Sequence, residues 1–274
     1  MITLEIPYDG VPEANLQFVN AYEEDDGTFV FDAIRSDGGG SGGAGRWPWA
    51  STPAAYRAAA AGTSLWRYRA DPRGAGSVTK ERLSAEPLHF ATVNPAAAGR
   101  AHRYVYAAAG AAGEDAAAPP QGLVRLDLAA AGGEGGAVGR EAWFPAAHEF
   151  CGEPVYARRQ GGDEVDGTDG DDGYVVATLF DGREESSSIV VLRANNLAAG
   201  PVARIPLGMA VPHGYHGCFV PTADACWSHE EIERRAKLAD KMEARGSMWN
   251  EVKSDFSGLG LRFDDMEEYF GDLM

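Results

Sequence analysis

Residues 174–180 read YVVATLF, and this short run shows which kind of fold to expect. It is rich in β-branched and aromatic residues, and turn-forming Gly and Asp residues lie on both sides, so it predicts a β-strand. Segments of similar length and composition recur at 28–34, 65–69, 103–107, 123–128, 188–193, 202–206 and 218–221. Many short strands separated by polar loops predict an all-β fold of the sandwich, barrel or propeller type.

The charge balance around these strands excludes one class of partner. The 274 residues contain 41 Asp+Glu against 24 Lys+Arg, a formal net charge of −17. Nucleic-acid binding requires a basic surface that neutralises phosphates, so we expect no nucleic-acid partner, and anionic membrane surfaces are disfavoured for the same reason. No apolar run approaches the roughly 20 residues that a membrane span requires, and we expect no signal peptide. Three cysteines without a CxxC pair favour a reducing compartment and disfavour a zinc site.

The character of the sequence changes after Trp227. Ser228-His229-Glu230-Glu231 matches a capping box, so we expect a helix over about 229–244, which Gly246 would end. The sequence therefore predicts two parts: a β domain at 1–227 and an acidic helical extension at 228–274. We expect the extension to pack on the β domain; the alternative is a partner-binding peptide.

Two loop segments have compositions that resemble known binding motifs. Gly38, Gly40 and Gly43 have the spacing of a dinucleotide fingerprint, but no helix follows them, so we interpret them as a flexible loop. The acidic run 163–173 lacks the spacing of a calcium loop and lies between two strand-like segments. We interpret it as a hairpin loop.

Among the six histidines, one lies in a favourable local setting. Residues 211–219 read VPHGYHGCF, and their Pro and Gly residues predict a tight turn that could direct the His216 imidazole at a metal. The alternative is a hydrogen-bonded structural histidine. No histidine pair has the spacing of a zinc-protease helix, and no nucleophile motif is present.

Five groups of segments follow one another in a fixed order: Phe18–Glu24 with Phe29–Asp32, Val93–Pro95 with Gly99–Tyr106, Gly152–Tyr156, Asp171–Tyr174 and Pro212–Phe219. In order and spacing they resemble the C-terminal half of the carotenoid cleavage oxygenase family, which includes the retinal pigment epithelial membrane protein-like members. The resemblance extends from about Leu16 to Pro221.

The resemblance implies part of a seven-bladed β-propeller, of which about three blades are represented here, followed by the helical tail. It also implies a non-haem Fe(II) on the propeller axis, held by four histidines that Glu carboxylates orient. Members of the family cleave a carotenoid or apocarotenoid double bond with O₂, and some isomerise their substrate instead. They occur in the cytosol and in plastids, so the compartment of this chain stays unknown.

Two residues match the family's iron site. His216 corresponds to the last of the four iron ligands. Glu153, in the Gly-Glu-Pro segment, corresponds to a Glu that orients a ligand, and the alternative is a surface carboxylate.

Two other positions depart from the family pattern. Gln17 stands where the family has its third iron ligand, and His89 stands where it has a ligand-orienting Glu. A Gln carbonyl is a poorer Fe(II) ligand than imidazole. His89 could donate a hydrogen bond to the Gln17 carbonyl in a site that has lost a ligand; alternatively, His89 itself reaches the metal.

The family's first two iron ligands precede this region, and only 16 residues precede Gln17. We therefore expect a truncated gene model, a split protein or a degenerate relative that lacks the N-terminal half. The predicted function is iron-dependent oxidative cleavage of a carotenoid-like polyene. The alternative is a non-catalytic propeller fragment that binds an apolar ligand or a partner protein.

Overall fold

The computed structural model describes residues 15–36, 63–72, 78–110, 120–130, 138–159, 171–211, 214, 216–220, 234 and 237. The chain divides into two compact units, Met1–Phe219 and Val220–Met274. Arg234 and Lys237, the only described residues of the predicted tail, are helical, and the rest of that helix lies outside the described residues. The domain boundary at 227/228 therefore stays a prediction.

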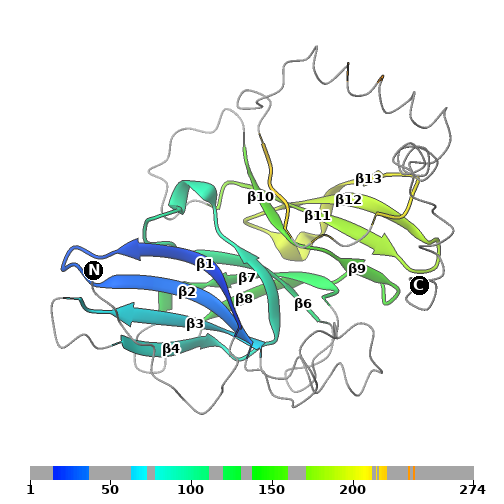
Figure 1. Cartoon of the computed structure of the whole chain (residues 1–274). Helices are drawn as coiled ribbons and strands as arrows, with labels where there is room; N and C mark the ends of the chain where they lie inside the picture. The colour runs from blue at the N-terminus through cyan, green and yellow to red at the C-terminus, as the bar shows by residue number, and fades with distance from the viewer. Residues whose placement is uncertain are drawn as a thin grey trace, which may run out of the picture. The chain divides into compact units, whose positions relative to one another are not determined.

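The first unit consists of three antiparallel sheets, each built from strands that follow one another in the chain (Figure 1). The first contains β1 (Asn15–Glu23), β2 (Phe29–Ser36), β3 (Thr63–Ala70) and β4 (Val78–Ser84). The second contains β5 (Leu88–Thr92), β6 (Tyr104–Ala109), β7 (Gly122–Asp127) and β8 (Gly139–Trp143). The third contains β10 (Val155–Arg158), β11 (Gly173–Asp181), β12 (Ser186–Arg193) and β13 (Pro201–Pro206), with β9 (Glu149–Cys151) paired to β11.

The second sheet shares a hydrophobic core with each of the other two. On β6, Val105 and Ala107 join a core with residues of the first sheet, while Tyr106 and Ala108 join a core with residues of the third. Alternate side chains of a strand point to opposite faces, so β6 is buried on both. This explains why its sequence, YVYAAA, is apolar throughout instead of alternating.

The strand predictions are confirmed for most segments. β2, β3, β6, β7, β11, β12 and β13 form where the sequence predicted strands, within a few residues. The prediction for 218–221 is wrong in the described residues 218–220, which have strand composition but no strand conformation. The sequence did not predict β1, β4, β5, β8, β9 and β10. β4 and β8 are edge strands rich in charged residues and lack a continuous apolar pattern.

The acidic run 163–173 connects two paired strands, β10 and β11, as expected for a hairpin. Residues 160–170 themselves, and the glycine-rich stretch 38–45, lie outside the described part of the chain.

A buried polar network joins the first sheet to the segment before β6. Arg67 donates two hydrogen bonds of 2.8 Å to Asp32, and His102 Nε2 lies 3.0 Å from Asp32 Oδ2. Asn20 contacts His102 Nδ1 at 3.1 Å and donates to the carbonyl oxygen of Ala97. Burial by itself raises the pKa of Asp32, but the bonds from Arg67 and His102 outweigh it and hold that pKa below its ordinary value.

Candidate metal centre

The segment after β13 brings His216 to Glu153, which precedes β10. His216 Nδ1 lies 3.0 Å from Glu153 Oε1, and the backbone N–H of Gly217 donates to Glu153 Oε2. The carboxylate therefore bridges the imidazole and the backbone next to it. A carboxylate on one imidazole nitrogen fixes the tautomer and aims the other nitrogen, which is the usual support of a histidine metal ligand.

A small cavity lies beside this pair. Its volume is about 210 Å³, and its walls include Val155, Val176, Ile189 and Phe219 together with Glu153 and His216. Ligand pockets usually span about 300–1,000 Å³, so this one could accommodate only part of a large apolar ligand. The His216 side chain itself is 71% exposed.

Gln17 on β1 contacts strand β5. Its side-chain Oε1 accepts a hydrogen bond of 3.3 Å from the backbone N–H of Phe90. The expectation that His89 donates to this carbonyl is wrong: the donor is the neighbouring backbone amide. The amide group of Gln17 thus ties the first sheet to the second.

His89 has a buried ring nitrogen without a partner. Its Nε2 atom is out of contact with solvent, and no hydrogen-bond partner for it exists among the described residues. Burial lowers the pKa of His89 to about 4. The ring is therefore neutral near pH 7, which is the form that can accept a hydrogen bond or bind a metal.

Phe90 connects these groups. Its ring centroid lies 6.3 Å from that of His89 and 6.5 Å from that of His216, in an edge-on arrangement with the latter. The Phe90 backbone has a positive φ of 54°, which is unfavourable for a residue with a side chain, and it lies where the pairing of β5 with β6 is irregular. Gln17, His89 and the pair of His216 with Glu153 are therefore all linked through Phe90, although they lie far apart in the sequence.

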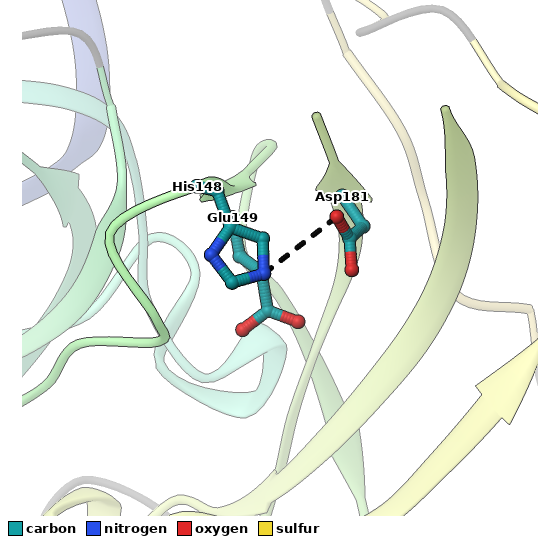
Figure 2. Close-up of side chains that lie close together, drawn as sticks. All are labelled: His148, Glu149 and Asp181. Carbon is teal, nitrogen blue, oxygen red and sulfur yellow. Dashed lines mark ion pairs between the residues drawn. The ribbon is translucent and has the colours of Figure 1, made fainter. Parts of the chain in front are cut away.

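Sequence reasoning missed a second group with metal-binding side chains. His148, Glu149 and Asp181 offer one ligand atom each within 4.8 Å of one another, and Figure 2 shows them lying close together. His148 Nε2 lies 3.7 Å from Asp181 Oδ1. The signal was weak, because His148 and Glu149 are adjacent in sequence while Asp181 lies on another strand.

This group could hold a metal ion, but its carboxylates already have donors. Glu149 accepts from Arg204 and from the backbone N–H of Ala146. Asp181 Oδ1 accepts hydrogen bonds from the backbone N–H groups of Arg183 and Glu184. These two bonds hold the pKa of Asp181 below its ordinary value. An ion here would have to compete with the Arg204 guanidinium, which already compensates the charge.

The described residues form three antiparallel sheets of consecutive strands, and a Glu carboxylate supports a histidine that could bind a metal. These features define a class of all-β protein with a candidate metal centre. The family model described as retinal pigment epithelial membrane protein matches residues 11–221. The chain therefore belongs to this family, which is that of the carotenoid cleavage oxygenases.

The curated proteins that this chain is similar to are named as carotenoid or apocarotenoid oxygenases. The chain is 31% identical over 158 residues to the apocarotenoid-15,15'-oxygenase of Synechocystis sp., covering 58% of this chain and 29% of that protein. It is 35% identical over 149 residues to a probable chloroplastic carotenoid cleavage dioxygenase 4 of Arabidopsis thaliana, covering 54% and 24%. It is 35% identical over 153 residues to a chromoplastic zeaxanthin 7,8(7',8')-cleavage dioxygenase of Crocus sativus, covering 54% and 38%.

Solved structures of related proteins resemble this chain as well. A cobalt-substituted apocarotenoid oxygenase of Synechocystis superposes with a TM-score of 0.60 at 27% identity, covering 75% of this chain and 39% of that one. The chain thus spans between about a quarter and two fifths of the length of these relatives. Within the described residues, no helix is both long and apolar enough to cross a membrane.

Proposed function

We propose that this chain forms the C-terminal part of an iron-dependent dioxygenase that cleaves a carotenoid or apocarotenoid. The observation that carries the proposal is the contact of Glu153 with His216, at the two positions where the family resemblance places a ligand-orienting Glu and an iron ligand. The three sheets would be three blades of a seven-bladed propeller, and the N-terminal half would supply the others.

The donor chemistry fits a metal at His216. Glu153 holds Nδ1, so Nε2 is the nitrogen that a metal would take, and a neutral imidazole suits Fe(II). The chemistry that Fe(II) supplies when bound is the activation of O₂ for cleavage of a polyene double bond. The donor set is incomplete in this chain, because Gln17 offers only an amide oxygen.

The chain's own residues would prepare the site. Glu153 fixes the His216 tautomer, and the Gly217 N–H fixes the carboxylate. The largely apolar walls of the cavity would receive one part of the polyene. The relatives named chloroplastic or chromoplastic make a plastid one candidate compartment, with the cytoplasm as the other.

The experiment compares the wild-type chain with His216→Ala after anaerobic loading with Fe(II). We expect iron to bind to the wild-type chain and to be lost in the variant. Loss of polyene absorption in the presence of an apocarotenoid and O₂ then reports activity. Equal iron content in the two proteins would contradict the proposal.

A second function is favoured by the exposed edge of the third sheet. Val202, Ile205, Leu207 and Met209 are all exposed, Met209 by 63%, on β13 and the residues after it. Exposed apolar residues on an edge strand are typical of a surface that another chain covers. A chain that binds no Fe(II) but retains a carotenoid or a partner protein would be a non-catalytic propeller fragment.

A further inference from the structure

Strand β5 is interrupted at Phe90. Leu88 and His89 pair with β6, and the pairing resumes only at Thr92, so Phe90 lies in the gap. A break of this kind takes a backbone N–H out of the ladder, and another acceptor must then satisfy it. Gln17 on β1 supplies this acceptor, because its side-chain Oε1 accepts the Phe90 N–H at 3.3 Å.

The Phe90 backbone is also held in an unusual conformation. Among the described residues other than glycine, only Phe90 and Glu185 have a positive φ, of 54° and 49°. Glu185 lies in the turn between β11 and β12, and turns accommodate such values. Phe90 lies inside a strand, where backbone strain persists only if the contacts around the residue maintain it. The hydrogen bond to Gln17 is one such contact.

The Phe90 ring packs toward the third sheet. It contacts the core that the second sheet shares with the third, and it meets the His216 imidazole edge-on, with ring centroids 6.5 Å apart and planes at 84°. Edge-to-face contact is a favourable geometry for an aromatic pair. Glu153 contacts the same imidazole at Nδ1. Most of the His216 side chain is exposed, so its orientation depends on the contacts that remain.

We propose that Phe90 is a positioning residue for His216 and that Gln17 acts through it. Gln17 holds the Phe90 backbone, the Phe90 ring limits the rotation of the imidazole, and Glu153 fixes which nitrogen faces the metal. The inference rests on the proposed metal-binding function of His216. It gives position 17 a role that needs no bond to the metal, because an amide on the first sheet supports a histidine that follows the third.

The first test needs no metal. In the full 274-residue chain labelled with ¹⁵N-histidine, at about pH 8 where free histidine is neutral, His216 should show the separate ring-nitrogen signals of a protonated Nδ1 held by Glu153. We expect Phe90→Leu, which keeps an apolar side chain but loses the ring, to move these signals toward those of free histidine. Phe90→Tyr keeps the ring and should retain the wild-type signals. Gln17→Met keeps the side-chain length without a strong acceptor and should act in the same direction as Phe90→Leu.

A double-mutant cycle tests whether Gln17 acts through Phe90. If it does, Gln17→Met should add nothing to Phe90→Leu, since the ring that Gln17 helps to hold is then absent. Phe18→Leu is the matched control, because it removes an exposed ring of the first sheet that pairs with Phe31 instead. It should leave the His216 signals unchanged. Thermal melts confirm that each variant folds, and Phe90→Met serves if Phe90→Leu does not.

A Co(II) titration followed by visible absorption separates this inference from the function on which it rests. Co(II) is a suitable probe, since a cobalt-substituted relative has been crystallised. We expect His216→Ala to abolish binding. We expect Phe90→Leu to weaken it about threefold to tenfold, the range that one edge-on aromatic pair supports. Phe18→Leu should bind as the wild type does.

The outcomes distinguish the two proposals. Wild-type His216 ring signals in the folded Phe90→Leu variant would overturn the positioning role, whatever the metal titration shows. Additive effects of Gln17→Met and Phe90→Leu would overturn the part assigned to Gln17. Full Co(II) affinity in His216→Ala would contradict the metal-binding function, while altered ring signals in Phe90→Leu would still support the role of the ring.

Discussion

At the scale of single residues, the contact between Glu153 and His216 is the most sensitive point of the candidate site. Glu153→Gln keeps the size of the side chain but removes the charge that favours the correct imidazole tautomer. We expect the Co(II) affinity of the chain to fall about 10- to 100-fold. Isothermal titration calorimetry measures this, with Glu184→Gln as the control. Equal affinity in the two variants would show that Glu153 does not orient a metal ligand.

Asp32 is a residue on which stability depends. It is fully buried between Arg67 and His102, and Asp32→Asn leaves the Arg67 guanidinium without a charged partner. Breaking a buried ion pair in this way costs about 3–5 kcal/mol, so we expect a loss of that size in urea unfolding. Glu184→Gln, an exposed residue in the turn between β11 and β12, is the control and should change stability little.

Asp32 also determines part of the loss of stability at acid pH. The folded-state pKa of Asp32 lies below its ordinary value of 3.8, so its stabilising effect is complete above that value. It is lost as the pH falls through the lower, folded-state pKa, because protonation then becomes possible in the native protein. In acid titrations, the stabilities of wild type and Asp32→Asn should converge once the pH falls below the folded-state pKa of Asp32. Curves that stay parallel would contradict this assignment.

At the scale of the elements, close packing between strands restricts individual glycines. A Cβ on Gly173, the first residue of β11, would meet the carbonyl oxygen of Ala157 at 2.8 Å and the Tyr156 hydroxyl at 2.5 Å. The backbone oxygen cannot move aside, so we expect Gly173→Ala to destabilise the protein by about 1–3 kcal/mol. At Gly214, no atom of the other described residues lies within 4 Å of an added Cβ, and Gly214→Ala should be close to neutral. Thermal unfolding of the two variants compares them directly, and equal losses would contradict the packing argument.

At the scale of the whole molecule, the third sheet ends in an apolar edge. Val202 and Ile205 on β13 are 48% and 52% exposed, and among the described strands β13 pairs only with β12. Such an edge favours association with another chain, and lysine on an edge strand opposes it. We expect Val202→Lys/Ile205→Lys to reduce concentration-dependent self-association in sedimentation velocity, whereas Thr79→Lys on β4 should not. Unchanged association of the double variant would show that β13 is not the contact surface.

The sequence by itself determined the all-β class and most of the strands, and it singled out His216 and Glu153, which the structure brings into contact. Those properties are encoded locally, because strand composition, turn residues and short motifs depend on near neighbours in the chain. It did not determine that 218–220 lack a strand, since an apolar run becomes a strand only when another strand offers hydrogen bonds. Gln17 meets Phe90, and Asp32 meets His102, only after the sheets have packed. The tertiary structure alone decided which side chains satisfy one another, and that His89 Nε2 has no hydrogen-bond partner among the residues that the structure describes, because burial and pairing depend on residues up to 82 positions apart.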